Sequence, residues 1–153
     1  MNLAKETKDI LVQAPIAAGT TTQKGSAAVD TKNFLGCKFT HILGTHGTTG
    51  LVVAKIQSST AGSVWVDCYD AVAASKVTQS STKAKDDTLL ILDVFRPRTR
   101  YLRSYITRPS TAGGSEYGGT IATLYGPRTL PTGASTTYGT TAGPMQSVSP
   151  GAT

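Results

Sequence analysis

Short apolar runs with a period of two, separated by turn-forming residues, are the feature that most constrains how this chain folds. In the segment 34–43, Phe39, His41 and Leu43 fall on one face of a predicted strand, because successive side chains of a strand point to opposite faces. No segment carries an apolar stripe at i, i+3, i+4 and i+7 over two helical turns. The pattern therefore predicts strands rather than helices.

Turn residues divide the chain into about eight or nine strands spaced about ten residues apart. The predicted strands are 10–14, 26–30, 34–43, 51–57, 64–69, 89–95, 99–107 and 120–125, with 71–79 ambiguous between a short helix and an edge strand or loop. We therefore predict an all-β fold: an antiparallel β-sandwich or a jelly-roll-like barrel.

Two details of this pattern lead to more specific expectations. The segment 89–95 is apolar at nearly every position, which predicts a central strand buried on both faces. Gly36 lies inside the predicted strand 34–43 and indicates a bulge or a bend.

Composition agrees with a Thr-rich β protein. Charged residues are 16% of the chain, against about 25% in an average soluble protein, and Thr is about one residue in six. These values argue against a coiled coil, and the 39% of hydrophobic residues argues against a charge-driven disordered chain. No apolar run approaches the roughly 18 residues of a membrane-spanning helix, and residues 1–9 do not resemble a secretory signal peptide. Cys37 and Cys68 are accordingly expected to be reduced.

The texture changes after Gly126, where proline, glycine and threonine dominate and large apolar residues become sparse. We predict an N-terminal extension over residues 1–8, a β-sandwich domain over 9–126 and an extended C-terminal arm over 127–153. Two alternatives stay open for the arm: plain disorder, or ordering on a neighbouring subunit through its larger side chains.

The net charge of +6 suggests an acidic partner, and the positions of the arginines indicate where on the chain that partner would bind. All six arginines lie between residues 96 and 128, and basic and aromatic residues alternate in the segment 95–108. Adding the large residues of the arm gives these candidate interface residues: Arg96, Arg98, Arg100, Tyr101, Arg103, Tyr105, Arg108, Arg128, Leu130, Tyr138 and Met145.

An interleaved Arg–Tyr strand supports two kinds of binding. Arginine and tyrosine are enriched at protein–protein interfaces, and this interpretation is favoured. The alternative is a barrel that binds single-stranded nucleic acid by stacking bases on the tyrosines. No catalytic constellation, cofactor motif or familiar metal-ligand spacing stands out, and Cys37 and His41 would lie about 13 Å apart along one strand. We expect no enzymatic activity, no metal and no cofactor.

The order of segments resembles a known family. The segments are KDILVQAP, AAVDTKNFLGCKFTHILGT, AKIQSSTAGSVWVDCYDA, DDTLLILDVFRPRTRYLRSYITR and GGTIATLYGPRTLPT, within residues 8–132. Together they look like the small head proteins of tailed bacteriophages that decorate or cement the capsid.

The resemblance implies a β-sandwich or jelly-roll body on the outer surface of the virion capsid, often as a trimer. It implies a structural protein without catalysis, bound to the major capsid protein and bridging neighbouring capsid subunits. No individual residue role carries over from the family. Another virion subunit, such as a tail-tube, adaptor or fibre-base protein, is the nearest alternative, and no membrane partner is expected.

Overall fold

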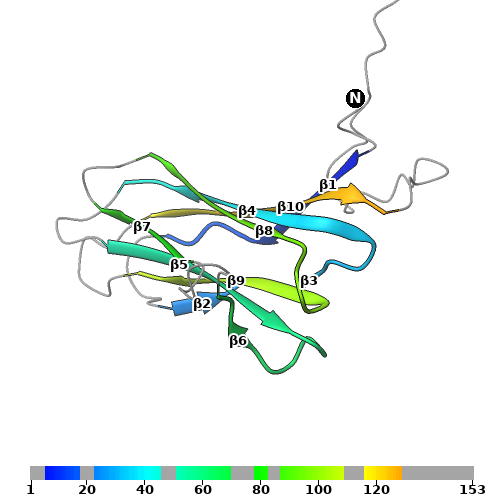
Figure 1. Cartoon of the computed structure of the whole chain (residues 1–153). Helices are drawn as coiled ribbons and strands as arrows, with labels where there is room; N and C mark the ends of the chain where they lie inside the picture. The colour runs from blue at the N-terminus through cyan, green and yellow to red at the C-terminus, as the bar shows by residue number, and fades with distance from the viewer. Residues whose placement is uncertain are drawn as a thin grey trace, which may run out of the picture.

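A computed structural model of the chain describes residues 6–17, 23–45, 51–69, 78–82, 87–108 and 116–128. Every element in these ranges is a strand, and the strands form two antiparallel sheets, so the prediction of an all-β sandwich is confirmed (Figure 1). The elements are β1 Thr7–Gln13, β2 Gln23–Gly25, β3 Val29–Asp30, β4 Phe34–Leu43, β5 Leu51–Ser59, β6 Val66–Asp67, β7 Thr78–Thr82, β8 Leu89–Phe95, β9 Tyr101–Thr107 and β10 Tyr117–Pro127. The described residues contain no helix of the length and apolarity that crossing a membrane requires.

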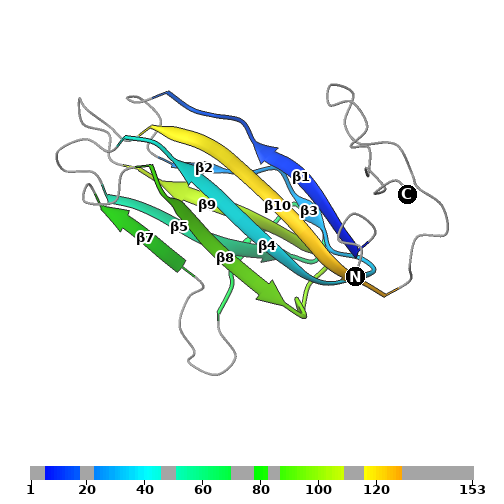
Figure 2. The ribbon, with the colours of Figure 1, turned by 90° about the horizontal axis from the view of Figure 1, so that it is seen from above.

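The first sheet, sheet A, has the strand order β1-β10-β4-β8, and the four strands lie side by side in Figure 2. β4 pairs with β10 and with β8, so the strand 34–43, predicted with its observed bounds, is internal. Among the residues that the structure describes, β8 has no second partner in this sheet and forms its edge. The prediction that 89–95 is a central strand, buried on both faces, is therefore wrong: Leu89, Ile91 and Phe95 are exposed.

The second sheet, sheet B, is built around the pair β5 and β9. β2 and β3 both pair with the outer side of β9, at different points along it. β6 and β7 likewise both pair with the outer side of β5. The strand predicted at 26–30 is thus replaced by two short strands, β2 and β3, on either side of residues 26–28. If β2 and β3 count as one strand, and β6 and β7 as another, sheet B is four strands wide.

The two sheets together have the topology of a jelly roll. If the two short strands at each edge of sheet B count as one, the orders are β1-β10-β4-β8 and β2/β3-β9-β5-β6/β7. The chain moves repeatedly from one sheet to the other, as it does in the double Greek key of this fold. This topology brings residues that are distant in sequence to the same end of the sandwich.

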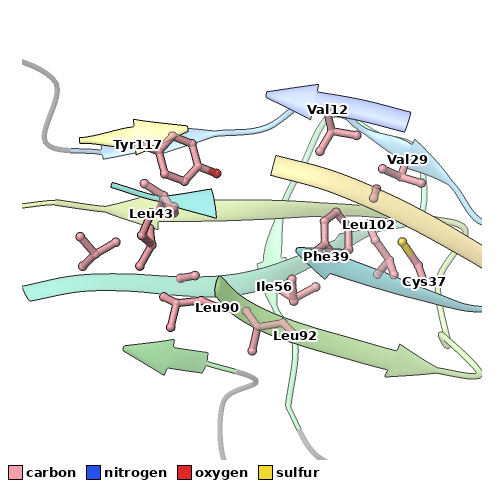
Figure 3. Close-up of a cluster of buried hydrophobic side chains, with 14 of the residues drawn as sticks. Val12, Val29, Cys37, Phe39, Leu43, Ile56, Leu90, Leu92, Leu102 and Tyr117 are labelled. Carbon is pink, nitrogen blue, oxygen red and sulfur yellow. The ribbon is translucent and has the colours of Figure 1, made fainter. Parts of the chain in front are cut away.

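The core lies between the sheets and is filled by inward side chains of β1, β3, β4, β5, β8, β9 and β10 (Figure 3). Phe39, Ile56 and Leu102 are at most 1% exposed and come from three different strands. The alternation predicted for β9 is confirmed, since Leu102, Ser104 and Ile106 are buried and their neighbours are half-buried. Period-two patterning thus correctly assigned the inner and outer faces of β9.

Gly36 does not mark a bulge. It pairs with Tyr125 of β10 and with Phe95 of β8, and neither register shifts at this position. A Cβ atom at this position would lie 2.3 Å from the ring of Tyr125 on β10. Glycine therefore makes room for a tyrosine on the neighbouring strand, which the sequence of β4 alone does not reveal.

Candidate functional site

The arginines of the predicted basic segment lie in three separate places. Arg98 and Arg100 lie in the connection between β8 and β9, at one end of the sandwich. Arg103 points outward from the middle of β9. Arg108, expected at an interface, is 4% exposed and donates from Nη1 to the carbonyl of Ala17. The segment is therefore not one continuous basic surface.

On the outer face of sheet B, Arg103 is held between a glutamine and a tryptophan. Its Nε donates to Oε1 of Gln57 at 2.9 Å, and its guanidinium carbon lies 4.4 Å from the centre of the Trp65 ring. Partial burial lowers the pKa of Arg103 from its ordinary value. These contacts hold Arg103, which was predicted to contact a partner, against residues of its own chain.

The same face carries a polar network that continues from Gln57. Nε2 of Gln57 donates to Asp67 at 2.9 Å, and Lys55 forms an ion pair with Asp67 at the same distance. Lys55 also lies over the ring of Tyr105, 5.1 Å from its centre. Of these residues, sequence reasoning selected Tyr105 alone, because β5, β6 and β9 meet only in the folded sheet.

The predicted aromatic platform is already occupied by cations of the chain itself. Arg100 lies over the ring of Tyr101, and both Lys55 and Arg103 lie over the ring of Tyr105. Cation–π contacts of this kind stabilise a folded face by about 0.5–1 kcal/mol each at exposed sites. A base that stacked on these rings would have to displace them.

Four cationic side chains line one open cavity at the end of the sandwich where β9 begins. They come from three segments and are Lys32, Arg98, Arg100 and Arg128. The cavity has a volume of about 390 Å³, and Phe34 and Pro97 form its apolar part. Three of the four were predicted as interface residues, and Lys32 was missed because it is distant in sequence. We call this cavity the basic end pocket.

Within the pocket, Arg100 is paired with Asp30. Nε and Nη2 of Arg100 donate to the Asp30 carboxylate at 2.7–3.2 Å. The hydrogen bond from Arg100 holds the pKa of Asp30 below its usual value. Arg96 lies in the same connection but outside the pocket lining, and its guanidinium lies over the ring of Phe95.

An apolar surface covers part of the outer face of sheet A. Leu89 of β8 is directly opposite Ile42 of β4, and Leu11 of β1 is directly opposite Ile121 of β10. Ile91 of β8 extends the same surface. We call these five residues the apolar band. Leu11 is 64% exposed, Leu89 55%, Ile91 48% and Ile42 38%.

A histidine and a serine meet in the core, but no substrate can reach them. The hydroxyl oxygen of Ser104 lies 3.2 Å from Nε2 of His41, as in a nucleophile–base pair. His41 is 0% exposed and Ser104 is 1% exposed, and burial lowers the pKa of His41 to about 4. The contact joins the two sheets.

The remaining expectations concern metal and the arm. In the described ranges, no group of three or more His, Cys, Asp or Glu side chains is placed to hold a metal ion. Cys37 and Cys68 are both free thiols. Leu130, Tyr138 and Met145 lie outside the described residues, so their expected interface role has no structural description.

No protein-family model matches this sequence, and no curated protein matches it with significant similarity.

Proposed function

We propose that this chain is a structural subunit of a virion, a jelly-roll protein that binds the outer surface of a phage capsid and stabilises it without catalysis. The observation that carries the proposal of a subunit that assembles with other copies is the apolar band. A strand of a solvated sheet normally carries polar residues on its outer face, whereas β8 places Leu89 and Ile91 there.

The band is the kind of surface that a partner covers. Contiguous exposed apolar surface is uncommon on a soluble monomer and typically marks an interaction site. An edge strand with apolar outward residues also favours aggregation unless it is covered. We therefore assign the band to contacts between copies of this chain, because permanent homomeric interfaces are the more apolar class.

A second exposed apolar surface supports a ring rather than a two-fold dimer. Val64 is 75% exposed, Val66 61% and Tyr69 56%, and all three lie in the segment at the outer edge of sheet B. A chain with two different apolar surfaces can make head-to-tail contacts, which close into a ring when the rotation permits. A trimer that bridges neighbouring major capsid subunits is the arrangement we propose.

The alternative of a single-strand nucleic-acid binder has less support. Such proteins offer aromatic rings for bases to stack on. Here Tyr101 and Tyr105 already carry cations of the chain over their rings. A tail-tube, adaptor or fibre-base subunit is the nearest alternative among virion parts, and the location of the chain on the particle would distinguish these from a capsid-binding protein.

The test is association in solution followed by binding to particles. Light scattering should give a mass of three times 15.9 kDa, and the chain should co-sediment with expanded capsids of the phage that encodes it. Leu89→Asp/Ile91→Asp should dissociate the trimer. Ala28→Asp, an exposed residue between β2 and β3, is the matched control and should leave it intact. A monomeric wild-type chain that fails to co-sediment would overturn the proposal.

A further inference from the structure

The basic end pocket is formed by three segments that the topology brings together. Lys32 lies in the turn before β4, Arg98 lies in the connection between β8 and β9, and Arg128 follows β10. Arg98 is 66 positions and Arg128 is 96 positions from Lys32 along the chain, so the pocket exists only in the folded protein.

The four cations that line the pocket carry more positive charge than the neighbouring carboxylate of Asp30 neutralises. Asp30 pairs with Arg100. Among the described residues, Lys32, Arg98 and Arg128 have no ion-pair partner. Gathering like charges raises the energy of the folded state, and a bound anion removes that cost. The charge imbalance therefore points to an anionic ligand.

Main-chain contacts hold the walls of the pocket in place without a ligand. The carbonyl of Arg100 accepts hydrogen bonds from both the amide and the hydroxyl of Thr31, at 2.9 and 2.8 Å. The amide of Arg128 donates to the carbonyl of Asn33 at 2.8 Å. A site formed in advance loses less conformational entropy on binding, which favours affinity from few contacts.

We infer that the basic end pocket binds an acidic, extended segment of a partner protein. Carboxylates of the segment pair with Arg98 and Arg128, since guanidinium groups bind carboxylates with two parallel hydrogen bonds. An apolar side chain of the same segment lies against Phe34 and Pro97, which form the uncharged part of the lining.

A protein segment fits this pocket better than a nucleic-acid strand does. Phe34 is the one aromatic residue of the lining, and the described tyrosines of β9 are on the outer face of sheet B, with cations over their rings. A nucleic-acid strand needs successive stacking platforms along a basic groove. The combination of charge with a small apolar surface suits a carboxylate next to an aliphatic side chain.

The inference deepens the proposed function, because the acidic segment would belong to a capsid subunit. Only the identity of this partner rests on the proposed function. The test of the inference uses the purified chain without particles. Loss of peptide binding with intact co-sedimentation would refute the pocket alone, whereas intact peptide binding without co-sedimentation would refute the capsid role alone.

The experiment is calorimetric titration at about 50 mM salt with three probes: the blocked peptide Glu-Glu-Leu-Glu-Glu, inorganic phosphate and a short oligothymidylate. We expect the peptide to bind more tightly than the other two. Arg98→Gln/Arg128→Gln should weaken peptide binding by about tenfold or more, since two charge-assisted contacts are lost. Both side chains are exposed, so the variant should keep the thermal stability of the wild-type chain.

Arg96→Gln is the matched control, because Arg96 lies in the same connection but outside the pocket. It should change the peptide affinity by less than about twofold, through screened long-range charge alone. The inference is refuted by absence of peptide binding, by equal weakening in the control and pocket variants, or by phosphate binding as tightly as the peptide. Tighter, pocket-dependent binding of the oligothymidylate would assign the site to nucleic acid instead.

Discussion

Nε2 of His41 on β4 lies 3.2 Å from the hydroxyl oxygen of Ser104 on β9, and this contact links sheet A to sheet B through the core. On the other side of the ring, Nδ1 lies 3.1 Å from the hydroxyl of Tyr117 and 3.0 Å from that of Thr120. Both ring nitrogens are thus satisfied by neutral hydroxyls, so the imidazole can remain neutral inside the protein.

The buried imidazole makes stability depend on pH. Burial lowers the pKa of His41 from 6.5 to about 4, so between these values the unfolded chain binds a proton that the folded chain does not. Stability from this group is complete above pH 6.5 and is lost as the pH falls toward 4, by about 3 kcal/mol in total. Urea unfolding at a series of pH values measures the loss.

The matched variant for this prediction is His41→Gln, which cannot titrate in this range. Between about pH 7 and pH 4 the wild-type chain should lose about 3 kcal/mol more than the variant, because carboxylates contribute equally to both. Parallel curves would contradict the prediction. If the variant does not fold, the ring resonances of His41 in the wild-type chain serve instead, and they should not titrate above about pH 5.

The period-two pattern predicted inner and outer faces well, because each strand carries that information in its own residues. The alternation over 34–43 correctly put Phe39 and Leu43 in the core. The pattern failed for 89–95, where apolar residues on both faces of the strand predicted that other parts of the same chain cover both faces. Leu89 and Ile91 instead form an exposed band, and local sequence does not distinguish a surface covered by the chain from one covered by a partner.

The basic end pocket was predictable only in part. The local density of arginines identified Arg98 and Arg100. The addition of Lys32 depends on strand pairing over long distances in sequence, which a single sequence does not specify. The Arg103–Trp65 contact has the same origin, because these two residues are distant in sequence and meet only in the folded sheet.

The buried side-chain amide of Gln13 is predicted to lower the free energy of unfolding. Gln13 is 5% exposed, and neither its amide nitrogen nor its amide oxygen has a hydrogen-bond partner in the described part of the chain. A buried polar group without a partner costs about 1–3 kcal/mol. Gln13→Leu should therefore raise the free energy of unfolding by about 1 kcal/mol, measured by urea denaturation.

Gln57 provides the matched comparison, because it is also a buried glutamine on a strand but has both amide atoms bonded. Gln57→Leu leaves Arg103 and Asp67 without their shared partner, so it should lower stability by about 1–3 kcal/mol. A loss of stability in Gln13→Leu as large as that in Gln57→Leu would show that Gln13 is satisfied in solution.

Gly36 and Tyr125 should be energetically coupled. Because a Cβ at residue 36 would lie 2.3 Å from the Tyr125 ring, Gly36→Ala forces the ring to move and should cost about 1–3 kcal/mol. In the background of Tyr125→Ala the same change should cost less, and the double-mutant cycle measures the difference. Additive effects, within about 0.5 kcal/mol, would show that the tyrosine ring is not the obstacle.

Cys37 should be unreactive in the folded protein. It is 0% exposed, and burial raises the pKa of its thiol to about 12, so almost no reactive thiolate is present at about pH 8. In Cys68→Ser, which leaves Cys37 as the one thiol, a disulfide reagent should react only as fast as the chain unfolds. The reciprocal variant Cys37→Ser should react faster, because Cys68 is only half-buried. If the Cys68→Ser variant reacts as fast under native conditions as it does when unfolded in urea, the core around Cys37 opens readily.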